Sequence, residues 1–95
     1  MNQEILEKIN QRRRQMLVHS CIYYRMGEQV VSDYQFDKWA YELVDLQNNY
    51  PEESRKGVYY DFFMYFDGST GFDLPTGNPE IYSKALQILN YSKKR

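Results

Sequence analysis

Residues 19–43 read HSCIYYRMGEQVVSDYQFDKWAYEL, and this stretch decides the fold. It contains the end of one predicted helix, a short connection and the start of a second helix. Gly27 is a plausible helix stop, because glycine readily adopts the left-handed conformation that ends many helices. Ser32 and Gln35 have the spacing of a capping box, in which the serine hydroxyl accepts a hydrogen bond from the amide three residues later. The stretch therefore predicts two antiparallel helices joined by about five residues.

The apolar spacing outside the connection supports both helices. The first helix is expected from Asn2 or Gln3 to about Met26, and the second from the Ser32 cap to Pro51, whose ring disfavours helical geometry in the residue before it. Apolar residues return every three or four positions along both, as expected for helices with one buried face. They are Leu6, Ile9, Met16 and Leu17, followed by Tyr23 and Tyr24, in the first helix, and Phe36, Trp39, Ala40, Leu43, Leu46 and Tyr50 in the second.

The rest of the chain predicts two further parts. Residues 53–77 form an aromatic segment and a loop, with a short helix expected among the aromatic residues 59–66 and a loop at 67–71. Residues 78–95 form a C-terminal helix that Asn78 caps and Pro79 opens. Its expected buried face consists of Ile81, Tyr82, Ala85, Ile88 and Leu89. The prediction is a single all-α domain over residues 1–95, built on an antiparallel helical hairpin with an extra C-terminal helix.

Three consecutive arginines, Arg12, Arg13 and Arg14, interrupt the apolar stripe of the first helix. Consecutive residues spread around a helix, so at least one of these side chains must lie near the buried side. The interpretation we favour is a solvated basic face. The alternative is a cluster that binds phosphate or a partner, because guanidinium groups match phosphate oxygens in bidentate geometry.

Composition limits the classes of function. The 95 residues are 42% hydrophobic with a formal net charge of -1, which fits one compact domain and gives no global reason to expect nucleic acid. Cys21 has no partner for a disulfide, and neither a signal peptide nor an apolar run of membrane-spanning length is evident. The expectation is a cytoplasmic protein with no membrane association. No metal-ligand cluster, Ser/His/Asp set or phosphate-binding Walker loop is present, so catalysis has little support.

The hairpin brings two kinds of binding group together. Asp33 and Asp37 are four residues apart on one helix face, and Tyr23 and Tyr24 close the preceding helix. Aromatic rings stack on planar heterocycles and carboxylates accept hydrogen bonds from ribose hydroxyls, a combination that suits a nucleoside. The alternative is structural, since acids stabilise a helix N-terminus and a tyrosine pair can simply pack at a helix end.

The residues from about 9 to 52 also resemble the small N-terminal helical domain, called Ia, of bacterial NAD-dependent DNA ligases. The pattern is a His, a Tyr pair, a short connection into Ser-Asp, an aromatic-Asp pair, a Glu-Leu and a closing Pro-Glu. Here these are His19, Tyr23, Tyr24, Ser32, Asp33, Phe36, Asp37, Glu42, Leu43, Pro51 and Glu52. The resemblance covers nearly half of the chain.

This resemblance implies a ligand and a site. In the ligases the Ia domain holds the nicotinamide mononucleotide (NMN) half of NAD. Carried over, it implies that Tyr23 and Tyr24 flank the nicotinamide and that Asp33 and Asp37 contact the ribose side, with His19 and Phe36 completing the site. Phe36 departs from the pattern, since the ligases usually have Tyr there. The ligase nucleophile, a lysine in Lys-x-Asp-Gly, has no counterpart, because the one Asp-Gly, Asp67-Gly68, follows Tyr65 and Phe66.

Two functions follow from these observations. The first is a non-catalytic protein that captures NMN, NAD or an NAD-derived nucleotide signal, encoded by a phage or mobile element as an anti-defence sponge. The aromatic segment and residues 67–71 would then close over the ligand. This closure could be within one chain or across the interface of a homo-oligomer. The second is a protein that inhibits a host enzyme or defence complex, in the manner of an anti-CRISPR, with the hairpin serving only as a scaffold.

Overall fold

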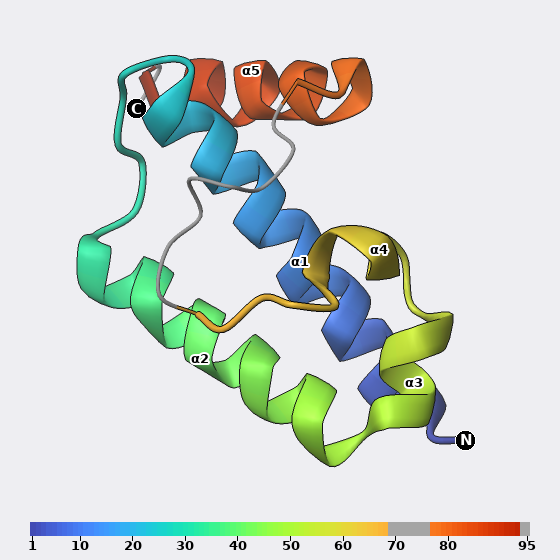
Figure 1. Ribbon diagram of the computed structural model, residues 1–95. Helices are drawn as coiled ribbons and strands as arrows, with labels where there is room; N and C mark the ends of the chain where they lie inside the picture. The colour runs from blue at the N-terminus through green and yellow to red at the C-terminus, as the bar shows by residue number, and fades with distance from the viewer. Residues whose placement is uncertain (69–76, 94–95) are drawn as a thin grey trace.

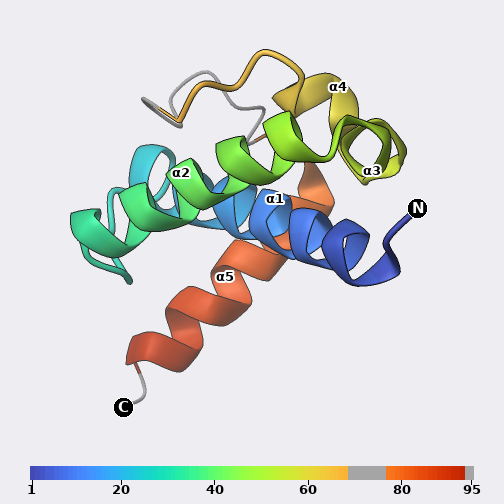
Figure 2. The ribbon, with the colours of Figure 1, turned by 90° about the horizontal axis from the view of Figure 1, so that it is seen from below.

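The computed structural model describes residues 1–68 and 77–93, and helices are the only regular secondary structure in these ranges, which contain no strand. The helices are α1 (Gln3–Tyr24), α2 (Asp33–Asn49), α3 (Pro51–Lys56), α4 (Tyr60–Phe63) and α5 (Pro79–Lys93). The long α1 packs against both α2 and α5, which lie on different sides of it (Figures 1 and 2). The prediction of an all-α domain built on a hairpin with an extra C-terminal helix is therefore confirmed.

Each long helix begins at a side chain that accepts a hydrogen bond from its first turn. Asn2 Oδ1 accepts from the amide of Ile5 at 3.2 Å, and Ser32 Oγ accepts from the amide of Gln35 at 3.1 Å. Asn78 Oδ1 accepts from the amide of Glu80 at 2.8 Å, and Pro79 occupies the first helical position. Such caps satisfy amides that have no partner within the helix, which is why the sequence located these helix starts correctly.

The end of α1 also follows the prediction. Gly27 has φ +66°, a left-handed conformation in which a side chain would be strained. The chain then crosses from α1 to α2 over residues 25–32, which is longer than the expected five. Figure 1 shows α1 and α2 close together near the N-terminus and further apart toward this connection.

The core lies along α1, where it meets α2 on one side and α5 on the other. Its buried apolar residues come from α1, α2, α4 and α5: Ile9, Met16, Leu17, Val18, Cys21, Ile22, Ala40, Leu43, Phe63, Ile81 and Ala85. Trp39, Phe36, Ile88 and Leu89 are partly buried around them. Four tyrosines of the predicted stripes are exposed instead of buried: Tyr23, Tyr24, Tyr50 and Tyr82.

Arg13 is fully buried, so the interpretation of the three arginines as a solvated basic face is wrong for this residue. Its Nη2 donates to Ser54 O at 3.0 Å and Ser54 Oγ at 2.8 Å, and its Nη1 donates to Val58 O at 2.9 Å. Its Nε donates to Gln47 Oε1 at 3.0 Å. Burial lowers the pKa of Arg13 to about 10, which leaves it ionised at neutral pH. One guanidinium group thus joins α1 to α2, α3 and the segment before α4.

The segment after Pro51 differs from the expected aromatic segment and loop. Pro51 ends α2, as predicted, but it also opens the short helix α3, whose Glu53 and Ser54 are buried. The expected helix among the aromatic residues is confirmed but covers only α4. Of the predicted loop at residues 67–71, positions 69–71 lie outside the described residues.

Candidate functional site

An open cleft of about 280 Å³ lies between the diverging ends of α1 and α2. All six residues predicted to bind a ligand line it: His19, Tyr23, Tyr24, Asp33, Phe36 and Asp37. Residues 28–31 of the connection complete the lining. The fold therefore brings together the residues that the sequence singled out.

The wall formed by α1 is aromatic. Tyr23 and Tyr24 stand edge to face, with ring centroids 4.9 Å apart, and they are 51% and 42% exposed. Because these two rings are not packed in the core, their exposed faces are available to stack on a ligand. His19 lies one turn earlier and is half-buried, and desolvation lowers the pKa of its imidazole from the ordinary value. The α1 wall is therefore uncharged near neutral pH.

The wall formed by α2 is acidic. Asp33 Oδ1 accepts a hydrogen bond from Gln29 Nε2 at 3.1 Å, and its place in the first turn of α2 favours its negative charge. Asp37 lies one turn later, is exposed, and has no hydrogen bond or ion pair within residues 1–68 and 77–93. Phe36 is partly buried and packs against the core. Asp37 is thus the carboxylate with the freest oxygens for a ligand.

The connection supplies lining residues that sequence reasoning missed. The sequence indicated only a spacer at residues 28–31, yet all four line the cleft: Glu28, Gln29, Val30 and Val31. Glu28 is held by an exposed ion pair with Lys93 of α5 at 3.4 Å. No spacing rule indicated these residues, because their position depends on how far the two helices diverge.

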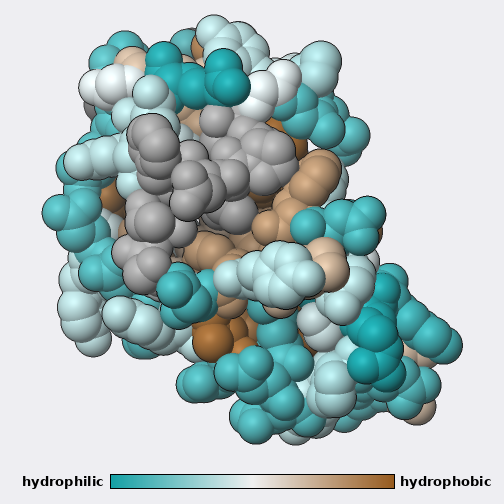
Figure 3. Space-filling model, viewed as in Figure 1, coloured by the Kyte–Doolittle hydropathy of each residue, from teal (hydrophilic) through white to brown (hydrophobic). Residues whose placement is uncertain are grey.

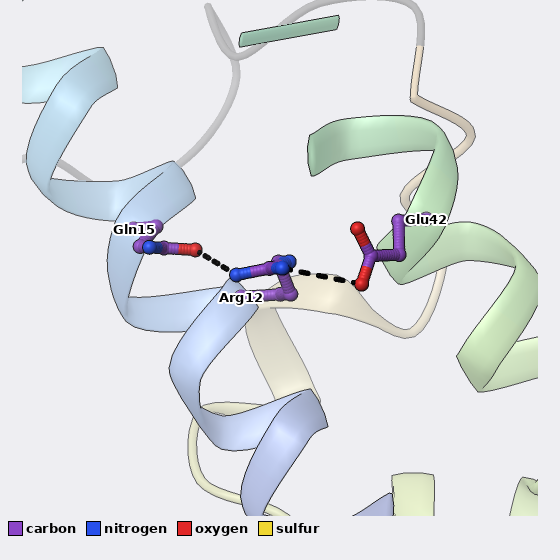
Figure 4. A network of polar contacts seen from close by, with 3 residues as sticks. All are labelled: Arg12, Gln15 and Glu42. Atoms are coloured by element: carbon purple, nitrogen blue, oxygen red, sulfur yellow. Dashed lines mark hydrogen bonds and ion pairs between the residues drawn. The ribbon is translucent and has the colours of Figure 1, made fainter. Parts of the chain in front are cut away.

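A second row of side chains supports His19. Its ring lies 5.4 Å from that of Trp39, and the guanidinium of Arg12 lies 5.9 Å from the centre of the Trp39 ring. Arg12 is held in turn by hydrogen bonds to Gln15 Oε1 at 2.7 Å and Glu42 Oε1 at 3.2 Å (Figure 4). The ion pair of Arg12 with Glu42 joins α1 to α2, and the Trp39 ring packs between Arg12 and the imidazole of His19.

The aromatic segment that was expected to close over the ligand does not line this cleft within its described residues 59–68. Instead, Arg13 lies 5.9 Å from the ring centres of both Tyr60 and Phe63, so this part of the chain packs beside the buried arginine. Residues 69–71 of the expected lid lie outside the described residues, and closure of the aromatic segment and residues 67–71 over a ligand stays a prediction.

The lining residues include no activated nucleophile. Cys21, the one cysteine of the chain, is buried in the core outside the cleft, and desolvation raises the pKa of its thiol although Arg25 acts against this. Within the described ranges, no group of His, Cys, Asp and Glu has the arrangement of a metal site. In those same ranges, no helix is both long and apolar enough to cross a membrane.

Comparisons of the chain with protein-family models, with curated proteins and with solved structures found no match. The resemblance to the ligase Ia domain therefore rests on the quoted residues, and what it implies about the ligand stays a prediction.

Proposed function

We propose that this protein is a non-catalytic binder of NMN, NAD or a related NAD-derived nucleotide, and that the cleft between α1 and α2 holds the nicotinamide riboside part. One observation carries the proposal: the four side chains that both residue chemistry and the resemblance indicate, Tyr23, Tyr24, Asp33 and Asp37, line a single cleft. His19 and Phe36, which the resemblance adds, line the same cleft.

The charges of the cleft favour an oxidised nicotinamide ring. That ring is a pyridinium cation, and cations are attracted both to aromatic faces and to nearby carboxylates. Tyr23 and Tyr24 supply the faces, while Asp33 and Asp37 supply negative charge and acceptors for ribose hydroxyls. A neutral, reduced ring loses the ionic part of this attraction.

The size of the cleft agrees with a ligand fragment of this kind. Pockets for drug-sized ligands range from about 300 to 1,000 Å³, and the cleft, at about 280 Å³, lies just below that range. It suits one nucleoside better than a whole dinucleotide. In a phage or mobile element such a protein would act as a sponge, lowering the free concentration of the nucleotide in the cytoplasm.

Calorimetric titration with NMN tests the proposal. We expect saturable binding that weakens more than tenfold in Asp37→Ala and Tyr23→Ala, because each removes a ligand contact without touching the core. Asp45→Ala and Tyr34→Ala are matched controls, since both residues are exposed on α2 and neither lines the cleft. Absence of NMN binding, or equal losses in the controls, would refute the assignment.

A second function is favoured by a different surface. Tyr34 and Tyr41 on the outer face of α2 are 76% and 58% exposed, and Asp37 and Asp45 lie beside them. Tyrosine is enriched in protein interfaces, and the acids would match a basic partner. Figure 3 shows apolar surface, coloured brown, among hydrophilic side chains on the face seen in Figure 1. The alternative proposal is a protein inhibitor of a host enzyme or defence complex. Its test is the isolation of a stable complex with that partner: we expect Tyr41→Ala to abolish the complex and Tyr23→Ala to leave it intact.

A further inference from the structure

A second cleft, which we call the α1/α5 groove, lies between α1 and α5 and has a volume of about 630 Å³. Val18 and Ile81 are almost fully buried at its base, and Ile88 of α5 adds further apolar surface. His19 lines this groove as well as the smaller cleft. The two cavities therefore border the same side chain.

Two cations stand at the α1/α5 groove without partners. Arg14 comes from α1 and Lys84 from α5, both are exposed, and neither has an ion pair or hydrogen bond among the described residues. The other two arginines of the run are engaged, Arg12 with Glu42 and Arg13 with Ser54. Among the described residues that line the groove, Glu80 is the one carboxylate, and the two cations outnumber it. A guanidinium and an ammonium on facing helices are suited to phosphate oxygens.

The two cavities thus have opposite charge. The smaller cleft carries Glu28, Asp33 and Asp37, whereas the α1/α5 groove carries Arg14 and Lys84. A complementary ligand has a cationic ring at one end and phosphates further along. His19, held neutral by burial, contributes no charge at the junction.

An aromatic ring is also available at the groove. Tyr59 lines it, and its ring is stacked on that of Phe62, with centroids 5.7 Å apart and planes 17° apart. A ring fixed in this way can stack on a second planar base, a contact that contributes about 1 to 3 kcal/mol per base in nucleic-acid binding proteins.

From this arrangement we infer that the protein binds a complete oxidised nicotinamide dinucleotide within its own chain, with the pyrophosphate and second nucleoside in the α1/α5 groove on Arg14 and Lys84. This inference rests on the proposed function, because it takes the smaller cleft as the nicotinamide site. It adds that no second domain is required to hold the other half of the ligand.

Calorimetry with fragments of the ligand tests the inference, using nicotinamide riboside for the smaller cleft, AMP for the groove and NAD for both. Because linkage makes the second contact intramolecular, NAD should bind at least tenfold more tightly than either fragment. Arg14→Gln combined with Lys84→Gln should weaken NAD binding about tenfold or more and leave the affinity for nicotinamide riboside unchanged. Lys8→Gln with Lys56→Gln is the control, since it makes the same change in net charge at exposed positions outside both cavities.

The outcomes separate the two proposals. Equal affinities of NAD and nicotinamide riboside, or no effect of the double variant on NAD, would overturn the role of the groove and leave the nicotinamide site standing. AMP binding that depends on Arg14 and Lys84, without any binding of nicotinamide riboside, would overturn both the nicotinamide site and the two-part ligand. Circular dichroism of each variant establishes that the helices are intact.

Discussion

Replacing Arg13 by alanine should be among the most destabilising single substitutions in this domain. The change removes the donors for Val58 O, Ser54 O, Ser54 Oγ and Gln47 Oε1, and it leaves a cavity where a fully buried side chain stood. A buried acceptor left without a donor costs about 1 to 3 kcal/mol, and Gln47 and the Ser54 hydroxyl can relieve part of this by rotating. The carbonyl of Val58 cannot rotate in this way, whereas the carbonyl of Ser54 keeps a hydrogen bond from the amide of Gly57 at 3.3 Å. We therefore expect a loss of about 3 to 5 kcal/mol in the free energy of unfolding.

Urea unfolding followed by the fluorescence of Trp39 measures this loss. Small domains have a free energy of unfolding of about 5 to 15 kcal/mol. The expected loss is therefore a large part of the total, and the unfolding midpoint of the variant should shift to a much lower urea concentration. Arg14→Ala is the matched control, because it makes the same chemical change one residue later at an exposed position and should alter stability by less than about 0.5 kcal/mol. A loss below 1 kcal/mol for Arg13→Ala would show that its hydrogen bonds do not hold the helices together as argued.

Two further predictions concern Gly57 and His19. A Cβ at Gly57 would lie 2.7 Å from Arg13 Nη1 and 2.9 Å from Asn10 Oδ1, so Gly57→Ala should cost about 1 to 3 kcal/mol in urea unfolding; wild-type stability in the variant would contradict this crowding. For His19, burial lowers the pKa, so the unfolded chain binds a proton more readily and stability falls as the pH drops below the ordinary value of 6.5. The wild type should therefore lose more stability than His19→Gln between pH 7.5 and 5, and identical pH dependence of the two proteins would exclude this effect.

The hairpin could be predicted because its signals are local. A side-chain cap at Asn2, Ser32 or Asn78 depends on a few neighbouring residues, and each predicted helix start was confirmed. The short helix α3 has Pro51 at its first position but no side-chain cap, its sequence PEESRK lacks apolar periodicity, and its buried Ser54 bonds to a distant arginine. Tyr82 was placed on the buried face of α5, but α5 packs chiefly on α1 and buries only a narrow stripe around Ile81 and Ala85.

The candidate site could be predicted in part. The spacing of Tyr23, Asp33 and Asp37 around a short connection indicated that they would lie close together, and they line one cleft. The α1/α5 groove could not be predicted, since it depends on where α5 crosses α1, and no pattern in residues 78–93 specifies that position. Nor did the run of arginines show which member is buried, because consecutive helical residues differ only in their direction around the axis.

The buried arginine lies at the middle of α1 and the cleft at its C-terminal end, and this separation has an evolutionary consequence. Substitutions around Tyr23 or Asp37 do not disturb the hydrogen bonds of Arg13, since no residue is shared between the two sets. Ligand choice can therefore change at the exposed residues Tyr23, Tyr24 and Asp37 without loss of the contacts that Arg13 makes. A lineage could exchange one ligand for another at these positions without first acquiring compensating mutations around Arg13, and the same separation makes the hairpin a practical scaffold for selecting new binders.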